Sequence, residues 1–76
     1  MTENQLAKEL GANLKSVMDE YGVNQKELSE MTGISRPMIN KYVNGETIPT
    51  LINLINIANI LDCELTDFVD AYEFIE

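Results

Sequence analysis

Few side chains of this 76-residue chain are suited to catalysis. The sequence holds 13 aspartates and glutamates, no histidine and a single cysteine, Cys63. Only carboxylates are therefore available as general acids or bases, and 13 of them in a small domain usually form a solvated surface. A Cys/His metal site is excluded because there is no histidine and the cysteine stands alone. The composition argues against an enzyme, and neither a metal nor a cofactor is expected.

A second group of side chains, between residues 35 and 44, is suited to binding. If these residues form a short helix, its outer face is polar, carries positive charge and is free to contact another molecule. The residues on this face are Arg36, Pro37, Met38, Asn40, Lys41 and Asn44. The sequence before and after residues 35–44 predicts the helices that hold this face in place.

Residues 24–45 have the pattern of a helix-turn-helix. Asn24 is a good N-cap, and Glu27 follows three residues later, as in a capping box. Gly33 can end this first helix because glycine adopts the left-handed conformation without strain. Ser29 is the small residue expected where two steeply crossing helices approach each other.

The second helix of the motif is marked at both ends. Ser35 can cap it, and Pro37 falls in its first turn, where the missing N–H costs nothing. Asn44 followed by Gly45 can end it. The apolar positions of the helix pair are Leu28, Met31, Ile34, Ile39, Tyr42 and Val43.

An amphipathic helix is predicted before the motif, over residues 3–21, with Thr2 and Gln5 as its capping start. Its apolar stripe consists of Leu6, Leu10, Leu14, Val17, Met18 and Tyr21. Gly11 interrupts this helix at a cost of up to about 1 kcal/mol relative to alanine, so it indicates close packing.

Two further helices are predicted after the motif, over residues 51–61 with Thr50 as N-cap and over 66–76 with Thr66 as N-cap. The core stripe of the former is expected to be Leu51, Leu54, Ala58 and Leu61, and the stripe of the latter Phe68, Ala71, Tyr72 and Ile75. Three more isoleucines, Ile52, Ile55 and Ile60, exceed what one buried face needs. The segments 50–61 and 66–76 are therefore candidate dimerisation helices, although a helix buried on several sides would explain the same residues.

Length and charge limit the class of protein. Residues 1–76 make one small domain. No transmembrane span and no secretory signal is recognisable, and one cysteine fits a reducing cytoplasm. The net charge of −8 argues against a nucleic-acid partner, but residues 24–50 hold three basic and three acidic residues, whereas residues 62–76 hold six acidic residues and no basic one. The motif is thus locally neutral.

The segment 24–68 resembles the Cro and phage-repressor class of helix-turn-helix domain, the xenobiotic-response-element family. The matching positions are Gln25, Leu28, Ser29, Gly33, Ile39, Asn44, Gly45, Pro49, Ala58 and Leu61. The resemblance implies an all-α fold, a compact five-helix bundle of the lambda-repressor-like DNA-binding type. It also implies a sequence-specific transcriptional regulator of double-stranded DNA, a homodimeric repressor that reads a pseudo-palindromic operator with its third helix in the major groove.

The resemblance also implies roles for single residues. Gln25 matches a residue at a helix N-terminus that contacts the phosphate backbone, and Asn44 matches a backbone-contacting residue just past the third helix. Arg36 is suited to bidentate contact with guanine, and Lys41 to guanine or a phosphate.

The remaining positions on the same face contribute less to hydrogen bonding. Ser35 faces the groove, while Pro37 and Met38 offer only apolar contact, for instance to a thymine methyl group. Asn40 matches a position that is more often turned aside. Glu46 departs from the family, which often has a basic residue there, and its charge would repel a phosphate.

An alternative is a protein-binding module on the same fold, such as an antitoxin, an anti-repressor or an acidic DNA mimic. Glu46 and the acidic residues 62–76 motivate this alternative. Replacing Arg36 and Lys41 with alanine discriminates between the two, provided that folding is intact.

Overall fold

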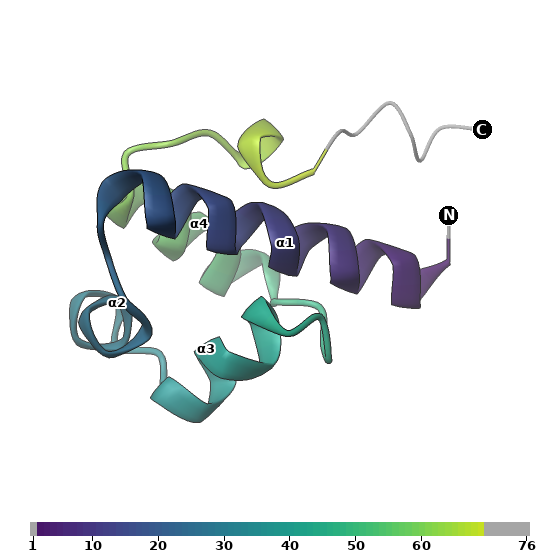
Figure 1. Ribbon diagram of the computed structural model, residues 1–76, viewed down its shortest axis with the longest axis horizontal. Helices are drawn as coiled ribbons and strands as arrows, with labels where there is room; N and C mark the ends of the chain where they lie inside the picture. The colour runs from purple at the N-terminus through teal and green to yellow at the C-terminus, as the bar shows by residue number, and fades with distance from the viewer. Residues whose placement is uncertain (1, 70–76) are drawn as a thin grey trace.

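The computed structural model describes residues 2–69, which form four α-helices and a 3₁₀ turn (Figure 1). The elements are α1 (Glu3–Tyr21), α2 (Gln25–Thr32), α3 (Arg36–Val43), α4 (Leu51–Ile60) and the turn η1 (Leu65–Asp67). The long α1 lies across the molecule, with α2 and α3 on one side of it and the segment that contains η1 on the other (Figure 1). None of the described helices is long and apolar enough to cross a membrane.

Each helix begins where a polar side chain caps it, as the sequence predicted. The four N-caps are Thr2, Asn24, Ser35 and Thr50, and each accepts a hydrogen bond from the backbone N–H three residues later. At Thr2 and Asn24 the capping box is complete, because Gln5 and Glu27 accept from the backbone N–H of the cap residue. Gly33 ends α2 with φ 78°, in the left-handed conformation.

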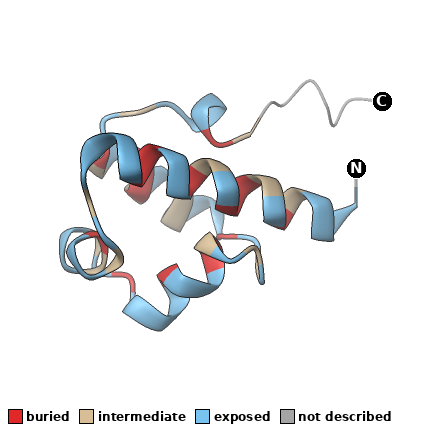
Figure 2. Cartoon of the chain, viewed as in Figure 1, coloured by how far each residue is buried: buried red, intermediate tan, exposed pale blue. Residues whose placement is uncertain are grey.

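The core lies between the helices, and all four contribute to it (Figure 2). Its buried members are Leu10, Leu14, Val17, Met18, Leu28, Ile34, Ile39, Tyr42, Ile57, Ala58, Leu61 and Phe68. Leu28, Ile39, Ile57 and Phe68 are completely buried, so residues from α2, α3, α4 and the η1 segment meet at the centre.

Gly11 is buried in α1, where the helix meets the end of α3. A Cβ atom at this position would collide with the backbone carbonyl oxygen of Tyr42 and would lie 2.8 Å from that of Val43. Backbone atoms cannot move aside as a flexible side chain can. The close packing predicted at Gly11 is therefore confirmed.

The predicted stripe of α4 is wrong at its first position. Leu51 is 65% exposed, whereas Ile57 is completely buried and Leu54 is partly buried. The inward side of α4 includes two asparagines: Asn53 Nδ2 donates to Tyr42 Oη at 2.9 Å, and Asn56 Nδ2 donates to the Thr32 carbonyl at 2.8 Å. Because these hydrogen bonds fix the rotation of α4, Leu51 turns outward.

Two other apolar residues expected to pack also lie at the surface, Tyr21 and Met31. Tyr21 is the last residue of α1, and its hydroxyl donates to the Asp62 carbonyl at 3.5 Å. The two-turn α2 buries Leu28 alone, which leaves Met31 on its outer side.

The predicted count of five helices is not confirmed, since the described residues hold four α-helices. Where a helix was predicted over residues 66–76, the chain forms η1, and residues 70–76 lie outside the described part. Thr66, the expected N-cap, lies within this turn, which starts with the Glu64 N–H donating to Asp67 Oδ2 at 2.8 Å. Phe68 follows and is completely buried.

Candidate nucleic-acid interface

The inner side of α3 anchors the candidate interface to the rest of the molecule. Ile39 is completely buried and Tyr42 is held by Asn53 of α4. The turn that precedes α3 is fixed as well, because Ser29 Oγ donates to the Ile34 carbonyl at 2.6 Å. These contacts set the direction in which the outer side of α3 points.

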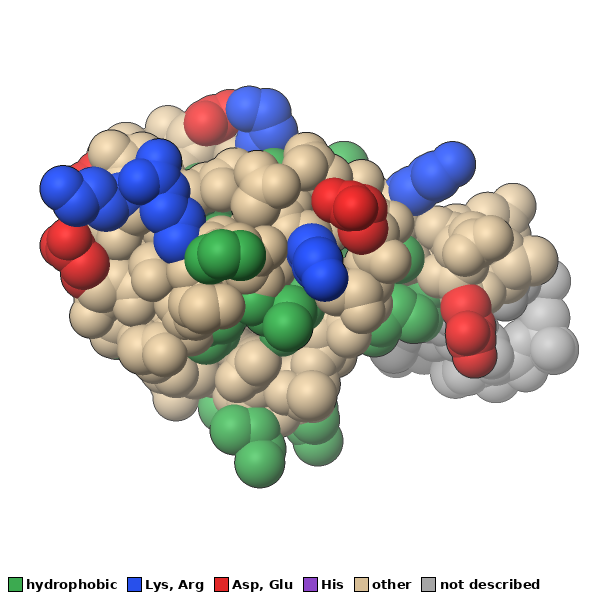
Figure 3. Space-filling view, turned by 90° about the horizontal axis from the view of Figure 1, so that it is seen from below, with side chains coloured by type: hydrophobic (Ala, Val, Ile, Leu, Met, Phe, Trp, Pro, Cys, Tyr) green, Lys and Arg blue, Asp and Glu red, His purple; other side chains and the backbone are tan. Residues whose placement is uncertain are grey.

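The outer side of α3 carries the residues expected to form a binding face. Ser35, Arg36, Pro37, Met38, Asn40, Lys41 and Asn44 are all exposed, and Gln25, the first residue of α2, is half-buried. Figure 3 views the molecule from the side on which α2 and α3 lie, and basic side chains stand on this face among mostly uncharged ones. The predicted separation of a buried inner side from a polar outer side is confirmed.

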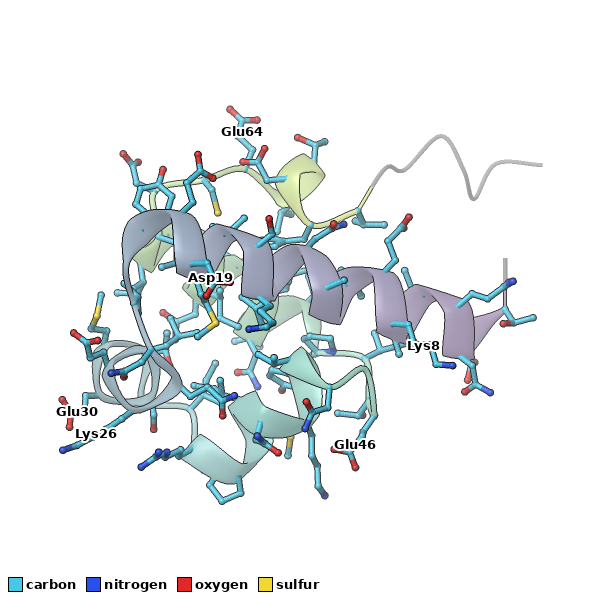
Figure 4. The ribbon with its side chains drawn as sticks, viewed as in Figure 1. Lys8, Asp19, Lys26, Glu30, Glu46 and Glu64 are labelled. Carbon is cyan, nitrogen blue, oxygen red and sulfur yellow. The ribbon has the colours of Figure 1, made fainter. Side chains whose placement is uncertain are left out.

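Five of the eight predicted site residues surround one hollow in this surface. The residues lining it are Gln25, Arg36, Pro37, Asn40, Lys41 and Glu46. Ser35, Met38 and Asn44 are not among them, and Glu46 is a sixth member that stands at the edge of the α3 face (Figure 4). The hollow therefore combines two cations, two amides and one carboxylate.

Arg36 and Lys41 are available to an external anion. Within residues 2–69 the one ion pair joins Lys15 to Asp19 at 3.8 Å, on the exposed side of α1. Glu64, in the acidic C-terminal segment, lies on the opposite side of α1 from Glu46 (Figure 4). Among the residues that line the hollow, Glu46 is the acidic one.

Hydrogen bonds between side chains link α2 to α3 at this surface. Asn40 Nδ2 donates to Gln25 Oε1 at 3.2 Å, and Asn44 Nδ2 donates to Asn40 Oδ1 at 3.0 Å. The sequence interpretation placed all three residues in the site but did not pair them. The pairing of Asn40 with Gln25 joins residues 15 positions apart, so no local pattern signals it.

A family model described as helix-turn-helix, HTH_3, matches residues 14–68, which include the whole of α2, α3 and α4. The chain belongs to the HTH_3 family. The match begins within α1 and ends at the buried Phe68, so it includes every buried residue of the core described above except Leu10. The resemblance seen in the sequence is thereby confirmed.

Three curated relatives match the HTH_3 chain. It is 36% identical over 88% of its length to replication factor C small subunit of Methanocaldococcus jannaschii. It is 30% identical over 83% to a putative HTH-type transcriptional regulatory protein of Pyrococcus furiosus, and 38% identical over 70% to YqaE, an uncharacterized HTH-type transcriptional regulator of Bacillus subtilis. The match spans 4%, 20% and 46% of these three relatives, less than half of each.

Solved structures show the same fold. An HTH_3 family transcriptional regulator from Vibrio cholerae superposes with a TM-score of 0.82 at 25% identity, over 88% of this chain and 38% of that one. The clp gene regulator ClgR of C. glutamicum superposes with a TM-score of 0.79 at 24% identity, over 93% and 94% of the two chains. Several of these relatives are transcriptional regulators, which agrees with the expectation of a non-enzymatic domain.

Proposed function

We propose that this chain is a sequence-specific DNA-binding regulator, a repressor that inserts α3 into the major groove of an operator in the cytoplasm. The exposed polar side of α3 carries this proposal, because its buried side is fixed by Ile39 and Tyr42 while the residues on its outer side are exposed. An α-helix fits the major groove, where every base pair presents a distinct pattern of donors and acceptors.

In this proposal, some residues of the α3 face contact bases and others contact the phosphate backbone. Arg36 offers two parallel N–H donors to guanine, and Lys41 offers a charge to guanine or to a phosphate. Gln25 contacts the phosphate backbone from α2, and Asn44 does so from the end of α3. Ser35, Pro37 and Met38 stand at the start of α3, where the apolar ones suit a thymine methyl group.

Selection of bound sites from a random duplex pool at low salt tests this function. The wild type is compared with the double variant R36A/K41A and with K15A, which removes a cation from α1 instead. Enrichment of one motif by the wild type and K15A, and not by the double variant, is expected. A folded wild-type protein that enriches no motif would overturn the proposal.

We further propose that the regulator is a homodimer in which α4 forms the contact. Leu51 and Ile52 are 65% and 79% exposed, and Ile55 is 41% exposed, so the start of α4 presents an apolar face to solvent. Exposed apolar patches on small proteins mark interfaces, and Figure 3 shows apolar side chains protruding from one edge of the molecule. The dimer role proposed for residues 66–76 falls largely outside the described residues.

Sedimentation equilibrium tests the dimer. The wild type is expected to dimerise at micromolar concentration, and L51S/I52S to sediment as a monomer with unchanged helix content. Asn59→Ser, on the same exposed side of α4, is the control and should still dimerise. A dimer of this kind would place two α3 helices about 34 Å apart and would select an inverted repeat. A wild-type monomer would remove this part of the proposal.

A protein partner is the second candidate, and Glu46 favours it. Its carboxylate borders the same hollow as Arg36 and Lys41, where it would repel a phosphate. If the pool selection fails, an interaction with a protein that is lost in R36A/K41A would support this candidate. Retention of such an interaction in the double variant would place the protein-binding surface elsewhere.

A further inference from the structure

Asn40 lies between two other carboxamides on the candidate interface. Its Nδ2 donates to Gln25 Oε1 and its Oδ1 accepts from Asn44 Nδ2, at 3.2 and 3.0 Å. We call this row of three side chains the amide relay. It runs from the first residue of α2, across α3, to the residue that follows α3.

The polarity of the amide relay determines what each residue can still offer. A carboxamide has one oxygen and two N–H groups. The oxygen of Gln25 is occupied by Asn40, which leaves both Gln25 N–H groups for another molecule. Asn40 and Asn44 each use one N–H, and among the described residues no further hydrogen bond is made by either amide nitrogen, so one donor remains on each.

Such a row of donors matches a phosphate better than a base. Phosphate oxygens only accept hydrogen bonds, and most contacts of this kind position a protein on the duplex. Bidentate recognition of adenine needs the oxygen and the nitrogen of one amide together. The oxygens of Gln25 and Asn40 each already accept one hydrogen bond within the amide relay, which leaves one lone pair on each for a base, whereas both N–H groups of Gln25 are left for a phosphate.

We propose that Asn40 is a positioning residue for DNA binding. It holds the Gln25 amide with its N–H groups directed toward a phosphate, and it anchors Asn44 for a second one. This inference rests on the proposed function and deepens it: neutral donors bind the backbone, and direct reading of bases is left to Arg36 and Lys41. The sites selected should therefore specify guanine at the positions under α3 that Arg36 and Lys41 contact.

Side-chain NMR signals test the amide relay without DNA. The N40A variant should shift the side-chain ¹H–¹⁵N signals of Gln25 and Asn44, while K41A, on the same face, should leave them in place. Asn40 is exposed and alanine favours helices, so N40A is expected to fold. Gln25 signals that do not respond to N40A would overturn the inference.

Coupling in DNA affinity tests the positioning role. Loss of one hydrogen bond to the DNA should weaken binding on the order of tenfold in N40A and in Q25A. Because Asn40 acts through Gln25 and Asn44, the double variant N40A/Q25A should lose little more than N40A alone. The matched pair M38A and Q25A share no hydrogen bond, and Met38 does not line the hollow, so their effects should multiply. Multiplying effects of N40A and Q25A would show that Asn40 contacts DNA by itself and would overturn the inference.

The two proposals fail in different ways. If no DNA sequence is selected although N40A shifts the Gln25 signals, the proposed function is wrong, and the role of Asn40 in DNA binding falls with it. If a sequence is selected but the Asn40 and Gln25 effects multiply, only the positioning role is wrong.

Discussion

The thiol of Cys63 shows how the environment of a single residue determines its chemistry. The side chain is half-buried, and burial raises the pKa of the Cys63 thiol. The carboxylates of Asp67 and Asp62 raise this pKa further, because a thiolate would lie near their negative charges. Thiolate is the reactive form of cysteine, so the folded protein protects this residue.

Alkylation of Cys63 at pH 8 should therefore be slower in the folded protein than in the same chain unfolded in urea. The sign of the shift gives a second expectation: a raised pKa favours the thiol form of the folded state, so the contribution of Cys63 to stability is present at neutral pH and is lost as the pH rises through the raised pKa. Reaction with iodoacetamide, followed by mass spectrometry, measures the rate. Equal rates for the folded and unfolded chain would contradict the assignment.

At the scale of one residue, the sequence predicted the caps and missed the amide relay. Thr2, Asn24 and Ser35 cap their helices through contacts with residues three positions away, so the local sequence is sufficient to predict these caps. The contact between Gln25 and Asn40 depends on how α2 and α3 cross, which a linear pattern does not specify.

Among the elements, α4 has an unusual distribution of polarity. Asn53 and Asn56 point inward and make hydrogen bonds to α3 and α2, while Leu51 and Ile52 point outward. Apolar residues occur around the whole helix, so their spacing did not reveal which side is buried. The physical reason is that asparagines and the buried Ile57 and Ala58 share the inward side, while apolar residues also lie on the outward side, so α4 lacks the usual amphipathic separation.

Substitution of an asparagine should lower the free energy of unfolding more on the inward side of α4 than on its exposed side. Asn56→Ala removes the donor to the half-buried Thr32 carbonyl and should lower the free energy of unfolding by about 1–2 kcal/mol. Asn59→Ala, on the exposed side, should change it by less than about 0.5 kcal/mol. Urea denaturation measures both. Equal effects of the two substitutions would contradict the inward role of Asn56.

For the whole molecule, the distribution of charge matters more than its sum. The net charge is −8, yet Lys26, Arg36 and Lys41 belong to the helix-turn-helix, and Glu64 lies on the other side of α1. Interactions between exposed charges fade over a Debye length of about 8 Å at physiological salt. The charge of Glu64 is therefore compatible with DNA binding by α3, while the low number of cations limits the strength of that binding.

DNA affinity should accordingly depend only weakly on salt. The helix-turn-helix holds three cations, so at most three phosphates per subunit are neutralised, and the slope of log affinity against log salt concentration should be no steeper than roughly −3, at about 0.9 for each phosphate. Titration of the selected DNA at several salt concentrations measures this slope. A much steeper slope would mean that a different surface contacts the DNA.

Gly11 lies where the longest helix, α1, contacts the end of α3. Since α1 meets the carbonyl groups of Tyr42 and Val43 without an intervening side chain, main-chain geometry holds α3 at its angle to α1. The direction in which the binding face of α3 points is therefore set by the main-chain contact at residue 11. In a symmetric dimer, a methyl group added at residue 11 would change the angle of α3 in both subunits. The separation of the half-sites that the protein accepts would change with it.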